Sequence, residues 1–73
     1  MRRSEFARAV EAEFGPRGDS LVSDLALSAV GYRTAEEALR DGVDAREVWL
    51  ALCVETDVPS ARRHGVGRLE RRR

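Results

Sequence analysis

The stretch Asp44-Ala45-Arg46-Glu47-Val48-Trp49-Leu50-Ala51-Leu52-Cys53-Val54 decides the fold of this chain. Asp44 can cap the first turn of a helix with its carboxylate, and Glu47 can reach back to the amide of Asp44, which together make a capping box. The helix has one wide apolar stripe, and Leu50 and Val54 form a second, narrower one. The wide stripe consists of Ala45, Val48, Trp49, Leu52 and Cys53. A helix that is apolar on two sides is typical of a central position, so we expect the rest of the chain to pack around it.

The length and composition limit the chain to one small domain. A domain of 73 residues buries only about 60% of the surface that its unfolded chain exposes, and its core rarely supplies more than about 3–5 kcal/mol. We therefore expect a protein partner or self-association.

One Cys and one His cannot provide an internal disulfide or a four-ligand zinc site. No apolar run approaches the roughly 20 residues that span a bilayer, and no secretory segment follows Met1. We expect a cytoplasmic protein with no cofactor, metal or membrane contact.

Two helices are predicted before the central one. The first begins at Ser4, which can cap it, and ends at Gly15-Pro16, because proline cannot continue a helix. Its apolar stripe consists of Phe6, Ala7, Val10 and Phe14. The second begins at Asp19 or Ser20, either of which can cap it, and ends at Gly31. Its apolar face consists of Leu21, Val22, Leu25, Ala26 and Ala29, while Leu27 lies off this face and is either a second contact or exposed.

A short third helix is predicted between Thr34 and Gly42. Thr34 and Glu37 form another capping box, and Gly42 stops the helix after about two turns. So short a helix is not stable alone, so we expect it to pack on the central helix. No stretch alternates between apolar and polar residues as a strand does. The sequence therefore predicts an all-α fold, a compact bundle of about four helices, with a helical domain in residues 1–59 and a basic, arginine-rich C-terminal tail in residues 60–73.

The charge is divided between these two parts. Residues 1–59 hold 7 arginines against 12 acidic residues, a net charge of −5, and residues 60–73 hold 6 arginines against Glu70, a net charge of +5. The tail arginines are candidate nucleic-acid contacts, because they could bind a phosphate backbone in a salt-dependent way. They are Arg62, Arg63, Arg68, Arg71, Arg72 and Arg73. A tail that solubilises the protein, or folds back on the acidic body, accounts for the same composition.

The residues that could carry catalysis are few. His64 is the only histidine and lies in a basic loop, with no serine or cysteine that the sequence places beside it. Cys53 lies on the buried stripe, where a thiol acts as a small hydrophobe. Glu36 and Glu37 are adjacent on a helix and point apart. We expect no catalytic activity and no small-molecule substrate.

The segment that joins the third and central helices resembles a helix-turn-helix unit of DNA-binding proteins. Ala38, Gly42, Val43 and Val48 have the spacing that lets two helices cross closely. A recognition helix, however, needs cationic or amide side chains in its first turn. This helix offers two carboxylates there, which would repel phosphates. We favour a packing role for the same spacing.

Two surfaces are candidate partner-binding sites. Leu50 and Val54 could form an exposed apolar strip with Arg46 at its charged rim, unless the first helix covers them. Tyr32 and Arg33 lie in the loop that follows Gly31. The first function that we predict is a non-catalytic module that binds a protein through one of these surfaces. The alternative is a nucleic-acid-associated protein that uses Arg33, the helix-turn-helix-like unit and the tail arginines.

Several short stretches, taken together, resemble a family of short actinobacterial proteins that is catalogued as a domain of unknown function. These stretches are Arg3-Ser4-Glu5-Phe6, Glu13-Phe14-Gly15, Gly31-Tyr32-Arg33-Thr34-Ala35 with Ala38-Leu39, Gly42-Val43-Asp44, Val48-Trp49 with Ala51-Leu52-Cys53, and Asp57-Val58-Pro59. The resemblance implies a small cytoplasmic helical protein that is commonly encoded near a recombinase and its regulator. This implies a link to DNA recombination or repair and brings no catalytic residue or cofactor. Tyr32 departs from the small residue expected after Gly31, and the arginine-rich end lies outside the pattern.

Overall fold

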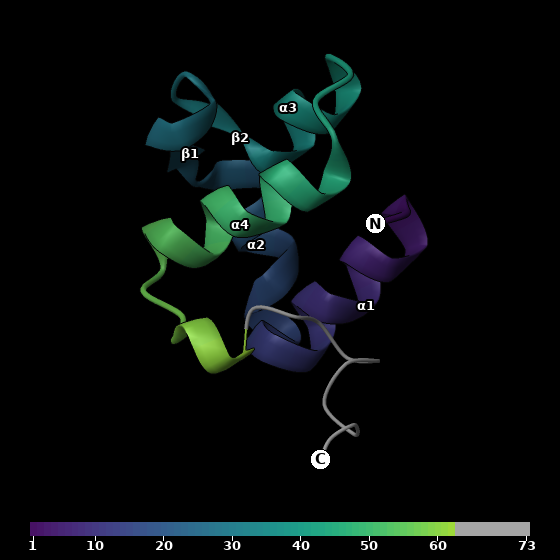
Figure 1. The fold of residues 1–73 in the computed structure, drawn as a ribbon, viewed down its shortest axis with the longest axis vertical. Coiled ribbons are helices and arrows are strands. Elements are labelled where there is room, and N and C mark those ends of the chain that lie inside the picture. Colours follow the sequence, from purple (N-terminus) through teal and green to yellow (C-terminus); the bar gives the residue numbers. More distant parts are fainter. Residues whose placement is uncertain (63–73) are drawn as a thin grey trace.

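Helix α4 (Ala45–Glu55) lies across the middle of the computed structural model, which describes residues 1–62 (Figure 1). Trp49 on this helix is only 1% exposed, and Val48 and Leu52 are completely buried, so the predicted central helix is confirmed. The predicted capping bond is wrong. Asp44 is the residue before the helix, but its side chain makes no cap hydrogen bond. The preceding turn, held by a bond of 3.0 Å from the Val43 N–H to the Ala38 carbonyl, leads the chain into α4 instead.

Helix α1 (Arg3–Phe14) supplies the aromatic partners of Trp49. The rings of Phe6 and Phe14 both lie edge-on to the indole, with centroids 6.4 Å away. The predicted cap at Ser4 is wrong, because the cap position is Arg2, two residues earlier, and the Arg2 N–H donates to Glu5 Oε1 at 2.7 Å. The buried face is Phe6, Ala9 and Val10, whereas Ala7, predicted on the stripe, is exposed. Helix α1 ends at Gly15 as predicted, with a left-handed φ of 58°.

The second helix is much shorter than the sequence predicts. A single 3-10 turn (Gly15–Arg17) leads into α2 (Gly18–Asp24), so neither Asp19 nor Ser20 is its cap. Gly18 is buried against α1, where a Cβ atom would lie 2.6 Å from Val10 Cγ1. The close approach of two helices at this glycine fixes where α2 begins. The helix ends before Leu25, whose backbone is extended.

A small antiparallel ladder replaces the end of the predicted second helix. Strand β1 (Ala26–Leu27) pairs with β2 (Arg33–Thr34), with Ala26 opposite Thr34 and Leu27 opposite Arg33. A 3-10 turn (Ser28–Val30) lies between the strands. The prediction of a fold without strands is therefore wrong. The sequence gives no sign of these strands, because a strand of two residues is too short to show an alternating pattern. Leu27, which lay off the predicted face, is fully buried, and Ala29, which lay on it, is exposed.

Helix α3 (Ala35–Arg40) has the predicted boundaries and the predicted capping box. Thr34 Oγ1 accepts from the Glu37 N–H at 3.1 Å, and Glu37 Oε1 accepts from the Thr34 N–H at 3.0 Å. Gly42, with φ 94°, ends the helix in a Schellman motif, and its N–H donates to the Leu39 carbonyl at 3.1 Å. The short helix packs on α4 as expected.

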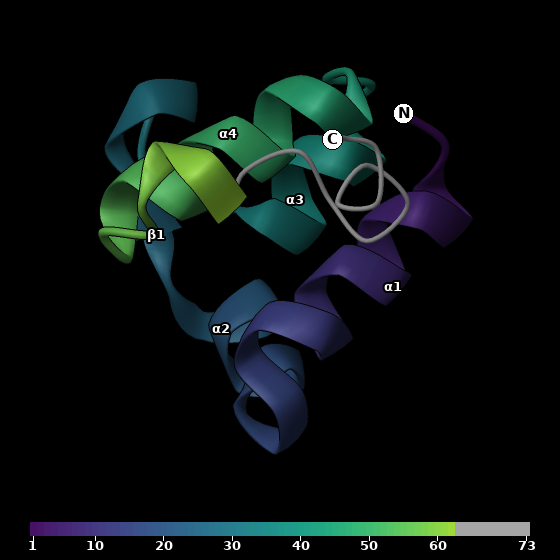
Figure 2. The ribbon, with the colours of Figure 1, turned by 60° about the horizontal axis from the view of Figure 1, so that its bottom comes forward.

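The domain is mostly helical, with two helix pairs around one apolar core. Helices α3 and α4 contact each other, as do α1 and α2, and the pairs meet where α1 contacts α4 and α2 contacts α3 (Figure 2). A last 3-10 turn (Ser60–Arg62) follows α4. Among residues 1–59, 61 and 62, no charged or polar side chain is buried, so the charged groups of this part of the chain lie on the surface.

Candidate functional site

The loop between the two strands presents an aromatic side chain to solvent. Tyr32 is 75% exposed and has a φ of 62°, next to Gly31 with φ 74°. A left-handed backbone costs a residue with a side chain roughly 1–2 kcal/mol relative to glycine. The loop therefore holds Tyr32 in an unfavourable backbone conformation with its ring pointing away from the core.

Arg33 fixes the loop from one side. Its Nε donates to the Val30 carbonyl at 2.9 Å, and its Nη1 lies 3.0 Å from Asp41 Oδ2 at the end of α3. These two bonds tie the strand that follows Tyr32 to the loop and to a helix end. Arg33 is thus a structural clamp in this conformation, and its guanidinium is already paired with a carboxylate.

Glu55 fixes the same loop from the other side. Its Oε1 accepts from the Ser28 N–H at 3.2 Å and from Ser28 Oγ at 3.1 Å. The last residue of α4 therefore caps the 3-10 turn that precedes Gly31. This contact joins the Tyr32 loop to the C-terminal end of α4.

The predicted apolar strip on α4 is only partly exposed. Val54 is 57% exposed, and among residues 1–62 only Tyr32 and Val54 are large apolar side chains with most of their surface in water. Leu50 is half-buried and packs against the core, while Arg46 is exposed. The structure therefore leaves Val54 as the apolar contact of this strip. It lies one residue before Glu55, which holds the Tyr32 loop.

The residues with the helix-turn-helix-like spacing pack α3 against α4. Ala38 and Val48 are completely buried, and Gly42 supplies the left-handed turn between α3 and α4. In the first turn of α4, Asp44, Arg46 and Glu47 are exposed. This arrangement brings two carboxylates and one guanidinium to the surface that a recognition helix would present.

Arg62 is the tail arginine that the structure describes. Its Nη2 lies 2.7 Å from Glu13 Oε2, and its Nε donates to both carboxylate oxygens of Glu13 at 3.1 and 3.2 Å. Glu13 lies on α1, 49 positions earlier in the sequence. The chain therefore turns back onto the acidic body at this point. The other predicted nucleic-acid contacts, Arg63, Arg68, Arg71, Arg72 and Arg73, lie outside the described residues, as does His64.

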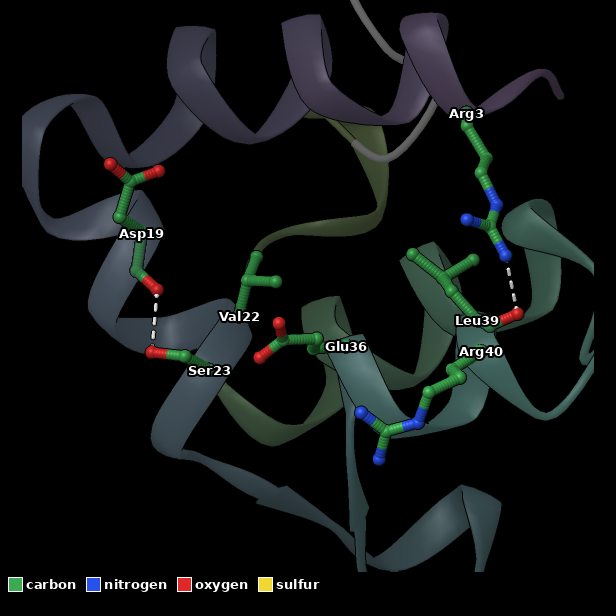
Figure 3. A pocket seen from close by; sticks show the side chains of 7 residues that line it. All are labelled: Arg3, Asp19, Val22, Ser23, Glu36, Leu39 and Arg40. Atoms are coloured by element: carbon green, nitrogen blue, oxygen red, sulfur yellow. Dashed lines mark hydrogen bonds between the residues drawn. The ribbon is translucent and has the colours of Figure 1, made fainter.

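A groove that sequence reasoning missed lies between α1, α2 and α3 (Figure 3). Its volume is about 500 Å³, and Val22 and Leu39 form its apolar floor. Its other lining residues are Arg3, Asp19, Ser23, Glu36 and Arg40. Arg3 reaches from the start of α1 and donates to the Leu39 carbonyl at 2.5 Å, which caps the end of α3. No local pattern could reveal this groove, because its walls come from three elements that meet only in the folded chain.

Metal-ligating clusters and membrane-spanning helices are two features that the described part of the chain lacks. In residues 1–62, no three His, Cys, Asp or Glu side chains come together as a metal site would require. Cys53 is buried in the core as predicted. None of the described helices has the length and apolar character needed to cross a bilayer.

These features define a small, mostly helical domain with a surface groove lined by charged residues and an exposed aromatic loop. The family model described as a protein of unknown function (DUF3046) matches residues 1–61. The chain therefore belongs to the DUF3046 family, which confirms the resemblance to a domain of unknown function. No curated protein and no solved structure matches the chain.

Proposed function

We propose that this protein is a non-catalytic interaction module that binds another protein at the end of the molecule formed by the Tyr32 loop and the C-terminal turn of α4. The observation that carries the proposal is the Tyr32 side chain, which is 75% exposed in a left-handed backbone conformation. A conformation that costs free energy and gives the core nothing is typical of a functional position.

The rigidity of the loop supports this proposal. Arg33 and Glu55 hold it from both sides with four hydrogen bonds of 2.9–3.2 Å. Binding costs less when the contact residue is already ordered, since little conformational entropy is lost. Tyrosine is also enriched among the residues that dominate binding energies at interfaces, because it combines a large apolar ring with a hydroxyl group.

Val54 supports a protein partner over a nucleic acid. It is 57% exposed on α4, next to the Glu55 that contacts the loop. An aliphatic and an aromatic side chain suit an apolar patch on a protein. The two described arginines that the nucleic-acid alternative requires, Arg33 and Arg62, are paired with Asp41 and Glu13.

Photo-crosslinking in the native cell tests this proposal. A photoreactive phenylalanine analogue at position 32 should give a discrete adduct with a protein, and the same analogue at Ala12, which is exposed on α1, should not. Identical adducts at both positions, or none at position 32, would contradict the proposal.

The variant Tyr32→Gly gives a matched measurement on a folded protein. Glycine suits the φ of 62°, so the melting temperature should stay the same or rise while the adduct formed by an analogue at Val54 is lost. Binding of labelled duplex and single-stranded DNA at low and moderate salt completes the test. Salt-dependent DNA binding that survives Tyr32→Gly would support the nucleic-acid alternative instead.

A further inference from the structure

Asp57, which follows helix α4, is a second residue whose backbone conformation costs the fold free energy. Among residues 1–62, the residues other than glycine that have a positive φ are Tyr32 and Asp57, at 62° and 64°. Asp57 is exposed and takes the left-handed position after a helix that glycine usually occupies. Aspartate tolerates this conformation better than most residues, but glycine adopts it without steric cost.

The charge of Asp57 is also unfavourable at this position. The C-terminal end of a helix carries a partial negative charge, and α4 has no basic residue in its last turn. Glu55 adds a carboxylate at the same end, but its Oε1 accepts two hydrogen bonds from Ser28. The described residues give the carboxylate of Asp57 no ion-pair partner. Asp57 therefore costs stability twice, and no contact in the described part of the chain compensates for its charge.

Asp57 lies beside the surface proposed to bind a protein. Its N–H donates to the Val54 carbonyl at 3.3 Å, so it is adjacent to the exposed Val54. Helix α4 contacts β1 and the 3-10 turn that precedes Tyr32, and its C-terminal end lies on the same side of the molecule as this turn (Figure 1). The two residues with an unfavourable backbone and the two exposed large apolar side chains therefore gather at one end of the domain.

We propose that Asp57 gives this surface its specificity, by selecting a protein segment in which an arginine or lysine lies next to an apolar side chain. This inference rests on the function proposed above and names the chemistry of the partner. The apolar side chain packs on Val54 and Tyr32, while the cation pairs with Asp57 and offsets the negative end of α4. An acidic segment or a phosphate backbone would meet charges of its own sign there.

Peptides of defined sequence test this specificity on the full chain. The probe is an acetylated and amidated pentapeptide of alternating leucine and arginine, and its control carries the neutral analogue citrulline in place of arginine. In an NMR titration, the arginine peptide should shift the amide signals of Tyr32, Val54 and Asp57. Its dissociation constant should be about two- to fivefold lower than that of the citrulline peptide, which is the effect of an exposed ion pair.

Two charge variants of α4 and its end assign this preference. Asp57→Asn should bind the two peptides equally, whereas Glu47→Gln, at an exposed carboxylate in the first turn of α4, should keep the preference for arginine. Equal affinity of the two peptides for the wild type, or an unchanged preference in Asp57→Asn, would overturn the inference.

Melting temperatures test the claim that Asp57 costs stability. Asp57→Gly relieves the backbone and Asp57→Asn removes the charge, so the melting temperature of each variant should stay the same or rise. Lower melting temperatures in both variants would mean that Asp57 serves folding, and this would overturn the inference.

The variant Tyr32→Gly separates this inference from the function on which it rests. It should weaken the binding of both peptides equally and leave the preference for arginine. Shifts at Tyr32 and Val54 without any preference for arginine would overturn the role of Asp57 alone. The absence of saturable shifts with either peptide, or tighter binding of a DNA oligonucleotide at these residues, would contradict the proposed function as well.

Discussion

Replacing Trp49 with alanine should unfold a large fraction of the protein. The indole is 1% exposed and contacts the rings of Phe6 and Phe14 edge-on at 6.4 Å. A buried aromatic side chain removes roughly 150–250 Å² from water, worth about 4–6 kcal/mol at 25 cal/mol per Å². The unfolded chain already hides part of this area, so a loss of about 3–5 kcal/mol is expected.

That loss is comparable with the whole stability of a domain this small. At about 0.05–0.15 kcal/mol per residue, 73 residues give a free energy of unfolding of roughly 4–11 kcal/mol. Because Trp49 is the only tryptophan, unfolding is followed by far-ultraviolet circular dichroism during heating and in urea. Trp49→Phe keeps an aromatic ring against Phe6 and should lose much less stability. A melting temperature of Trp49→Ala within a few degrees of the wild type would refute a core built around this ring.

Three further predictions concern the elements that the structure places around this core. Thr34→Ala removes the cap of α3 and should cost about 1 kcal/mol, which is roughly 4–8 °C in melting temperature. Ser4→Ala, inside the first turn of α1, should cost little stability. Equal losses in the two variants would contradict the assignment of Thr34 as a cap. Gly18→Ala places a Cβ atom 2.6 Å from Val10 Cγ1 and should lower the free energy of unfolding in urea by about 1–3 kcal/mol. Unchanged stability would contradict the close packing of α2 on α1 at this glycine. The hydrogen bond from the Arg2 backbone lowers the pKa of Glu5 below the ordinary value of a glutamate, so its stabilising effect is fully present above that ordinary value and is lost as the pH falls through the lower, folded pKa. The melting temperatures of wild type and Glu5→Ala should therefore converge on acidification, and a constant difference would be inconsistent with this bond.

The helices around buried apolar residues could be predicted because their signals are local. The capping box at Thr34 and the stops at Gly15 and Gly42 occupy the predicted positions. The end of the second helix could not be predicted, because it is determined by residues far away in the sequence. Leu27 pairs with Arg33, and Ser28 is held by Glu55, 27 positions later. These contacts outweigh the helical spacing of Leu25, Ala26 and Ala29.

The candidate site residues could also be predicted only in part. The sequence pointed to Tyr32 and Val54 as contact residues, and both prove to be exposed. It gave no sign that the backbone at Tyr32 is left-handed, nor that Leu50 is half-buried. Exposure depends on the tertiary packing of neighbours, which a single helix pattern does not contain.

The hydrogen bonds that cross between distant elements explain how short helices hold a rigid surface. Arg3 joins α1 to the end of α3, Glu55 joins α4 to the turn before Gly31, and Arg62 joins the end of the described chain to α1. Each contributes only about 0.5–1.5 kcal/mol at an exposed position. All three, however, lie at the ends of helices or turns, where fraying begins. Bonds at these places restrict local opening more than they raise global stability, so a small core can support the ordered loop that presents Tyr32.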